Sequence, residues 1–200
     1  MSTIILQSCY LGPVSYYSAL LKAEKALLEV NDHYGKQTYR NRCRIATANK
    51  VMDLTIPVER THEKTAMKDI AISYDEDWQK THWNAIESAY RTSAYFDYYA
   101  DELQVFYQNK ERYLLDLNMK LHELVGKWMQ LEDRIQLTPT TEYHTPGESE
   151  IDLRTAFNPK SAANKTKPYY QVFSQRHGFI ADLSVLDLVL NEGPEAYKYL

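Results

Sequence analysis

Two short apolar runs separated by a helical pattern occupy the first thirty residues, and this order limits the possible folds more than any other feature. Residues 3–9 are rich in isoleucine and leucine and lead into Gly12 and Pro13, a pattern typical of a buried strand followed by a turn. Apolar residues then recur at helical spacing from Val14, and residues 26–30 form the second apolar run. A strand, a helix and a strand in this order predict a β-α-β unit whose strands are parallel.

A hairpin is predicted directly after a basic stretch. Residues 44–48 and 51–58 flank the dipeptide of Asn49 and Lys50, and apolar and polar residues alternate in the second of these segments. Lys50 stands where a type I′ turn prefers glycine, but the flanking runs still favour antiparallel pairing. With one further strand expected over residues 69–74, the N-terminal part should contain a mixed sheet.

The middle of the chain is predicted to be helical. Residues 75–77 provide an N-cap candidate and negative charge before a helix whose inward face carries Trp78 and His82. Two more helices are predicted over residues 95–107 and 111–131. In the last one, leucines recur at alternating spacings of three and four, which indicates a continuous buried seam.

The C-terminal part has a weaker pattern. Residues 137–168 are rich in threonine, proline, asparagine and lysine, so we expect an irregular segment with one short interruption at 151–157. A strand over 169–173 and a helix over 182–190, stopped at Gly193, complete the prediction.

The predicted fold class is α/β, with an N-terminal β-α-β unit, a mixed sheet and a hairpin, followed by a predominantly helical middle and C-terminal part. We expect one domain over residues 1–200. It should contain an α/β part in 1–74, a helical part in 75–135, and an irregular segment plus a C-terminal helix in 136–200.

Composition excludes several classes of function. A formal net charge of -4 and a pI near 5.9 argue against nucleic acid as a partner, because phosphate contacts demand a basic surface. Cys9 and Cys43 are too few for a disulfide scaffold and lack zinc-site spacing, so we predict no metal. Neither a Walker A sequence nor GxGxxG occurs, and no cofactor is predicted. The low number of cysteines fits a reducing cytoplasm, and the short apolar runs predict no membrane partner. The many tyrosines would suit a homodimer interface.

A basic stretch interleaved with tyrosines covers residues 33–45 and reads HYGKQTYRNRCRI. If this stretch is extended, Arg40, Arg42 and Arg44 point to one side, where their guanidinium groups can hold a diphosphate. If it is helical, Arg42 turns away from the other two. In a third interpretation, the arginines tie carboxylates of the middle helices to the sheet. Asn41 and Arg42 are the expected inward pair, in a structural or a ligand-facing role.

Residues 7–10 lie at the carboxyl end of the first predicted strand, where ligands bind in open α/β sheets. Gln7 can hydrogen-bond a sugar or a base and Tyr10 can stack on either, or both can satisfy backbone groups of the turn. Cys9 near a helix N-terminus can act as a nucleophile with His33 as its base, although buried cysteines at strand ends more often pack in the core. His82 is interpreted as a core or capping histidine or, less commonly, as a catalytic acid or base.

Several segments together resemble the WbqC-like family over nearly the whole chain. The segments that carry the resemblance are LQSCYLGPVSYY, KQTYRNRCRI, LTIPV, the Trp78 to His82 spacing, Tyr95-Phe96 and PYYQVFSQRHGFIADLSVLDLVLNEGP. The positions that match the family pattern are Gln7, Tyr10, Tyr17, Lys36, Asn41 and Arg42. The family pattern opens with His-Gln-Pro, whereas this chain has Leu6 at the histidine position and also departs at Gly12 and Ser15. This chain therefore lacks the side chain on which a mechanism using that histidine would depend.

The resemblance implies a role in bacterial surface-polysaccharide (O-antigen) biosynthesis. It favours a transferase-like enzyme acting on a nucleotide-linked amino sugar or similar precursor, with a non-catalytic binding or assembly protein as the alternative. The expected partner is a small-molecule ligand, one that carries phosphate if the arginines contact it. The candidate catalytic residues are His33, Cys9 and His82, and the candidate substrate-binding residues are Gln7, Tyr10, Lys36, Arg40, Asn41 and Arg42. An enzyme should join Gln7, Tyr10, His33, Asn41 and Arg42 in one pocket, whereas a binding protein should present a shallow surface.

Overall fold

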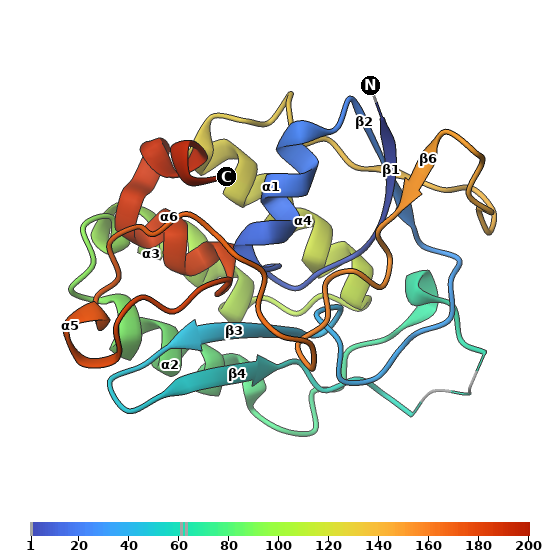
Figure 1. The fold of residues 1–200 in the computed structure, drawn as a ribbon. Coiled ribbons are helices and arrows are strands. Elements are labelled where there is room, and N and C mark those ends of the chain that lie inside the picture. Colours follow the sequence, from blue (N-terminus) through green and yellow to red (C-terminus); the bar gives the residue numbers. More distant parts are fainter. Residues whose placement is uncertain (1, 61, 63) are drawn as a thin grey trace.

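The computed structural model describes residues 2–60, 62 and 64–200. A four-stranded parallel sheet and a separate antiparallel hairpin are combined with helices that mostly follow them in the chain (Figure 1). This arrangement confirms the predicted α/β class. In the picture, α1 and α4 lie beside β1 and β2 towards the centre of the molecule, and the hairpin runs below them.

The strands of the described chain are β1 (Thr3–Gln7), β2 (Lys25–Glu29), β3 (Arg42–Ala46), β4 (Val51–Thr55), β5 (Thr138–Pro139) and β6 (Glu150–Asp152). The α-helices are α1 (Val14–Lys22), α2 (Trp78–Tyr90), α3 (Phe96–Gln108), α4 (Leu114–Met129), α5 (Ser174–His177) and α6 (Val185–Glu192). Two 3-10 helices are η1 (Met67–Asp69) and η2 (Gly193–Tyr199).

The predicted β-α-β unit is confirmed. β1 and β2 pair in parallel, with Thr3 opposite Lys25 and Gln7 opposite Glu29, and α1 connects them. Pro13 is the N-cap of α1, where its missing N–H costs no intrahelical hydrogen bond. The helix buries one face that includes Tyr17 and Leu20, and each such side chain contributes roughly 1.5–3 kcal/mol of transfer free energy.

The predicted hairpin is also confirmed, with β3 and β4 paired from Arg42 opposite Thr55 to Ala46 opposite Val51. Alternation along the strands sends Cys43, Ile45 and Leu54 into the core. The side chains of the opposite face, among them Arg42, point towards solvent.

Residues 137–168 differ from the prediction because they supply both outer strands of the parallel sheet. β5 pairs with β2 and β6 pairs with β1, so the strand order is β5-β2-β1-β6. These strands have two and three residues, too few to show a period of two in the sequence.

Two predicted strands are wrong. In residues 69–74, Ala71 and Ile72 make only isolated bridges. The apolar side chains of this segment are buried, but its backbone does not form a continuous row of hydrogen bonds with a neighbouring strand. Residues 169–173 form no strand. Tyr169 and Gln171 are buried there instead, and both donate hydrogen bonds to the carboxylate of Asp187 on α6.

The helices form where periodicity predicted them. Asp77 caps α2 by accepting a hydrogen bond from the Lys80 N–H, and α4 buries its leucine seam. α6 is buried along nearly its whole length and ends at Gly193, whose φ of 56° and closeness to the Tyr95 ring exclude a side chain. Of the helices described, none combines the length and apolar character needed to cross a membrane.

Candidate functional site

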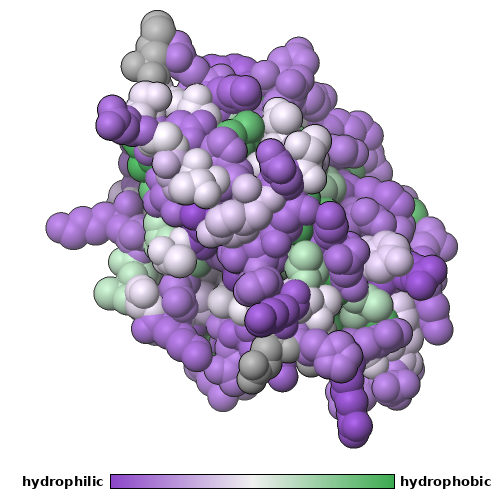
Figure 2. All heavy atoms as spheres, turned by 90° about the vertical axis from the view of Figure 1, so that its right-hand side faces the viewer, coloured by the Kyte–Doolittle hydropathy of each residue, from purple (hydrophilic) through white to green (hydrophobic). Residues whose placement is uncertain are grey.

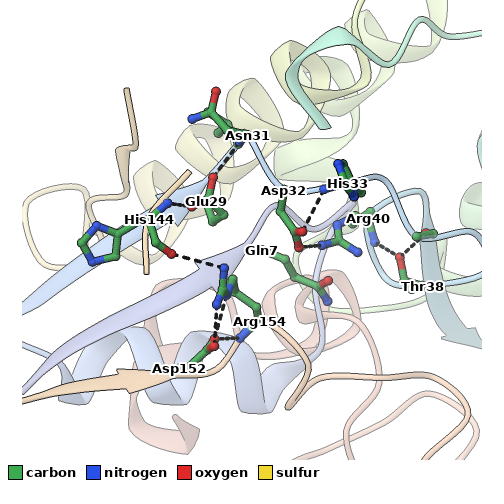
Figure 3. A network of polar contacts seen from close by, with 12 residues as sticks. Gln7, Glu29, Asn31, Asp32, His33, Thr38, Arg40, His144, Asp152 and Arg154 are labelled. Carbon is green, nitrogen blue, oxygen red and sulfur yellow. Dashed lines mark hydrogen bonds and ion pairs between the residues drawn. The ribbon is translucent and has the colours of Figure 1, made fainter. Parts of the chain in front are cut away.

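All four strands of the parallel sheet end at one edge, where residues at or just beyond the strand ends form a row of polar side chains. Gln7 lies opposite Glu29 in the register. Continuing the other pairings beyond the strand ends places Arg154 beside Gln7 and Thr140 beside Glu29. We call Arg154, Gln7, Glu29 and Thr140 the carboxyl-edge row. Figure 3 shows Arg154, Gln7 and Glu29 with neighbouring polar residues. This is the edge at which open α/β sheets bind ligands.

Glu29 is 1% exposed, and its carboxylate is fully engaged. It accepts hydrogen bonds from the Asn31 and His144 N–H groups, each at 2.7 Å, and from the Thr140 hydroxyl at 3.0 Å. A buried carboxylate is costly unless donors surround it. Glu29 therefore holds the chain after β5 against the end of β2.

Arg154 is held in one orientation by its neighbours. Its Nε and Nη2 donate to the two oxygens of Asp152 at 2.9 and 2.7 Å, and Nη1 donates to the His144 carbonyl at 3.4 Å. The guanidinium also lies over the Tyr143 ring, 5.3 Å from its centroid. Hydrogen bonding to Arg154 lowers the pKa of Asp152, so this pair is ionised.

Gln7 occupies the middle of this arrangement. In Figure 3 its carboxamide lies between Arg154 on one side and the Asp32–Arg40 pair on the other. Its Nε2 donates to the Phe157 carbonyl at 3.1 Å, and the residue is 3% exposed. The NH₂ group of the Gln7 amide is thus tied to the backbone, and this fixes the direction in which the amide oxygen points.

Arg40 forms the second guanidinium at this edge. Its Nη2 donates to Asp32 at 2.9 Å, and its Nε is buried without a hydrogen-bond partner among residues 2–60, 62 and 64–200. Asn118 donates to its carbonyl at 2.8 Å, which anchors this part of the chain to α4. His33 and Lys36 are exposed in the same connection between β2 and β3, and the His33 N–H donates to Asp32 at 2.8 Å.

Cys9 is buried, and burial raises the pKa of its thiol to about 12 although the Arg40 charge opposes the shift. The thiol is therefore protonated at neutral pH. No hydrogen bond joins Cys9 to His33 in the described part of the chain.

Tyr10 and His82 lie together in the core rather than at the edge. The Tyr10 hydroxyl is 3.0 Å from His82 Nδ1 and 2.7 Å from the Tyr107 hydroxyl. Burial lowers the pKa of His82 to about 4, so its imidazole is neutral at pH 7.

Asn41 and Arg42 belong to the hairpin. Asn41 is buried and donates to the Ile56 carbonyl at 2.8 Å, which braces the start of β3. Arg42 and Arg44 lie on the same face and both bind Asp53 of β4 at 3.1 Å. Their carboxylate partner is thus in the neighbouring strand and not in the middle helices.

The structure therefore distributes the predicted residues over three places. Gln7, Arg40, His33 and Lys36 lie at or beside the carboxyl edge, Tyr10 and His82 lie in the core, and Asn41 and Arg42 lie in the hairpin. Sequence reasoning missed Glu29, Asp32, Asp152 and Arg154. Glu29 lies in the second apolar run and Asp32 comes two residues after it, a signal that could have found both. Arg154, in contrast, follows a strand too short to predict.

Figure 2 turns the side of the molecule that carries β6 towards the viewer. Hydrophilic residues dominate this face, and hydrophobic residues appear only as small separate patches. Such a surface suits a polar small molecule better than an apolar partner. Among the residues that the structure describes, no group of three or more metal-ligating side chains occurs.

Comparison with known proteins gives one family. The model of the WbqC-like protein family matches residues 7–164, a range that contains the carboxyl-edge row and the hairpin. The chain is similar to the uncharacterized protein Rv1507c of Mycobacterium tuberculosis (strain ATCC 25618 / H37Rv), with 30% identity over 98% of this chain and 96% of that protein. No solved structure matches the chain.

Proposed function

Because the chain belongs to the WbqC-like protein family, we propose that it binds a nucleotide-linked amino sugar, or a similar phosphate-bearing precursor, in bacterial surface-polysaccharide (O-antigen) biosynthesis. The observation that carries this proposal is the position of Gln7 between two oriented guanidinium groups at the carboxyl edge of a parallel sheet.

The guanidinium groups retain donors for an anion. A guanidinium has five N–H groups, and Asp152 and the His144 carbonyl occupy three of those on Arg154. The remaining ones, with those of Arg40 that Asp32 leaves free, are suited to phosphate oxygens. Since both arginines are held by neighbouring carboxylates, little side-chain entropy is lost when they bind.

Charge at this edge favours a ligand that also carries an amine. Glu29, Asp32 and Asp152 are three carboxylates near the two guanidinium groups, and the exposed Lys36 is a third cation beside them. Groups of both signs therefore meet at this edge, where the cations attract phosphate and the carboxylates attract a protonated amine on the same molecule. The Gln7 amide is suited to a sugar hydroxyl or amide.

Thermal unfolding with a panel of nucleoside-diphosphate amino sugars tests the proposal. At a hundredfold excess over Kd, binding stabilises the native state by about 2.7 kcal/mol, which for this size raises Tm by about 5–10 °C. Gln7→Met should unfold at a lower temperature without ligand, because the Phe157 carbonyl loses its donor, and should lose most of the ligand-induced rise in Tm.

Gln79→Met is the matched control for that variant. Gln79 is also a buried amide that donates to backbone carbonyls, but it lies between α2 and α3. The Gln79→Met variant should keep the full ligand-induced rise in Tm. Wild-type protein whose Tm does not move with any member of the panel would contradict the proposed binding.

Transferase-like activity on such a precursor is the second candidate function. The observation that favours it is the exposed imidazole of His33 beside the Asp32–Arg40 pair, where it can exchange protons with a bound ligand. A His33→Gln variant should keep the thermal shift and lose turnover. Wild-type protein that binds the precursor without converting it, in the presence of candidate acceptors, would support a non-catalytic binding or assembly role.

A further inference from the structure

A hollow of about 550 Å³ lies between β4 and the start of α2, apart from the carboxyl edge. We call it the β4 groove. It is lined by Met52, Asp53, Leu54, Thr55, Pro57, Glu76, Asp77, Trp78, Thr81 and His82. The proposed precursor-binding row shares none of these residues.

Carboxylates dominate the charge of the groove. Asp53 is compensated by Arg42 and Arg44, whereas Glu76 and Asp77 are exposed at the start of α2. No lysine or arginine belongs to the lining, as far as the described residues extend. An anion would be repelled here and a cation attracted.

Hydroxyl groups on two walls complement these charges. The Thr55 hydroxyl accepts from Arg42 Nε at 3.2 Å and can still donate, and the Thr81 hydroxyl donates to the Asp77 carbonyl at 3.0 Å and can still accept. A ligand with hydroxyl groups can satisfy both.

Trp78 provides a second, independent sign of a missing partner. Its side chain is 5% exposed, and its indole Nε1 is buried with no hydrogen-bond partner in the described structure. Leaving such a donor unpaired costs roughly 1–3 kcal/mol, so a native structure rarely does this without reason. An acceptor oxygen that enters the groove at the indole edge would pair with it.

The His82 ring forms part of the floor and lies edge-on to Trp78, with 5.1 Å between ring centroids. Its Nδ1 is engaged by Tyr10, and it is uncharged because burial lowers the pKa of the imidazole. The floor is therefore aromatic and neutral, which suits the apolar face of a sugar ring.

We propose that the β4 groove is a second binding site, which takes a small organic cation bearing hydroxyl groups, such as a sugar with a free amine. Glu76 and Asp77 hold the ammonium group, Thr55, Thr81 and Trp78 bond the hydroxyls, and the aromatic floor supports the ring. This site is independent of the proposed precursor binding at the carboxyl edge.

Isothermal titration with three sugars tests the charge requirement. Glucosamine, glucose and glucuronate share a ring and hydroxyl groups but carry a positive, no and a negative charge below the pKa of the amine. Glucosamine should bind most tightly and glucuronate most weakly. Binding of glucosamine should weaken as the pH rises through the pKa of its amine. Equal affinity for the three sugars, or no binding of glucosamine, would overturn the proposal.

Two variants place the binding in the groove. Glu76→Gln should weaken glucosamine binding by about threefold or more, because one exposed ion pair is lost, and Thr81→Val should weaken both glucosamine and glucose. Glu87→Gln makes the same charge change at an exposed position farther along α2 and should leave the affinity unchanged. An equal loss in the Glu76 and Glu87 variants would indicate non-specific attraction and contradict the site.

The indole N–H signal of Trp78 provides a direct local readout. In two-dimensional NMR spectra this signal, assigned by its loss in Trp78→Phe, should move on titration with glucosamine and not with glucuronate. A Trp78 signal that stays fixed while glucosamine binds would show that the sugar binds elsewhere and would overturn the assignment to the groove.

Discussion

The Tyr10 hydroxyl and His82 Nδ1 lie 3.0 Å apart in the core and connect the segment after β1 with α2. The same hydroxyl is 2.7 Å from the Tyr107 hydroxyl of α3. One phenol therefore joins three elements that are distant in the sequence. It also connects the proposed precursor site, which includes Gln7 three residues earlier, with the floor of the β4 groove.

Replacing Tyr10 with phenylalanine should destabilise the protein without changing its fold. The variant leaves His82 Nδ1 and the Tyr107 hydroxyl without this partner in a buried place, which costs about 1–3 kcal/mol of unfolding free energy. Urea denaturation should show a lower midpoint with an unchanged m-value. Tyr98→Phe is the control, since Tyr98 is 77% exposed, and it should have little effect. Equal stability of Tyr10→Phe and wild type would show that the pair contributes nothing.

His82 should make the protein less stable in acid. Burial lowers the pKa of its imidazole from 6.5 to about 4 in the folded state. The stability from this group is thus complete above pH 6.5 and is lost as the pH falls towards 4, by about 3 kcal/mol in total. Unfolding free energies measured from pH 7 to 4 should fall more steeply for wild type than for His82→Gln. Unfolding free energies that fall with pH equally in wild type and His82→Gln would contradict the lowered pKa of His82.

Asp187 should act in the opposite direction over a similar range. Burial raises the pKa of its carboxyl from 3.8 to about 6, although hydrogen bonds from Tyr169, Tyr90 and Gln171 lower it. A carboxyl with a raised pKa adds stability below pH 3.8, and this is lost as the pH rises to about 6. Relative to Asp187→Asn, wild type should therefore gain about 3 kcal/mol as the pH falls through this range. Comparing the two pH profiles by denaturation checks the sign, and a wild type that loses stability relative to the variant would refute it.

Sequence reasoning succeeded where a pattern was local. The isoleucine and leucine runs of β1 and β2 and the leucine seam of α4 each contain their own period, so these elements could be predicted. β5 and β6 could not, because strands this short are set by pairing with β2 and β1.

The candidate site was predicted in part for the same reason. Gln7 ends the first strand and Arg40 stands in a basic stretch, so both could be found from local sequence. Arg154 could not, since its place beside Gln7 depends on the pairing of β6. Tyr10 comes three residues after the end of β1, but its phenol turns into the core to meet His82, a contact across 72 positions that no local pattern indicates.

The Glu29 carboxylate should be required to hold the chain after β5 at the carboxyl edge. In Glu29→Gln, an amide NH₂ replaces one of two oxygens that accept from His144, Asn31 and Thr140, so at least one donor faces another donor. We expect a loss of about 1–3 kcal/mol in unfolding free energy.

The Glu29→Gln substitution should also weaken the structure locally, around His144. In that variant the backbone amide of His144 should exchange with solvent faster than in wild type, whereas amides in α6 should lose only the protection that follows from lower global stability. Glu59→Gln, at an exposed position, is the matched control and should leave exchange unchanged. If the His144 amide kept its wild-type protection in Glu29→Gln, another interaction would hold this segment, and the Arg154 guanidinium, which bonds the His144 carbonyl, would be the next group to replace.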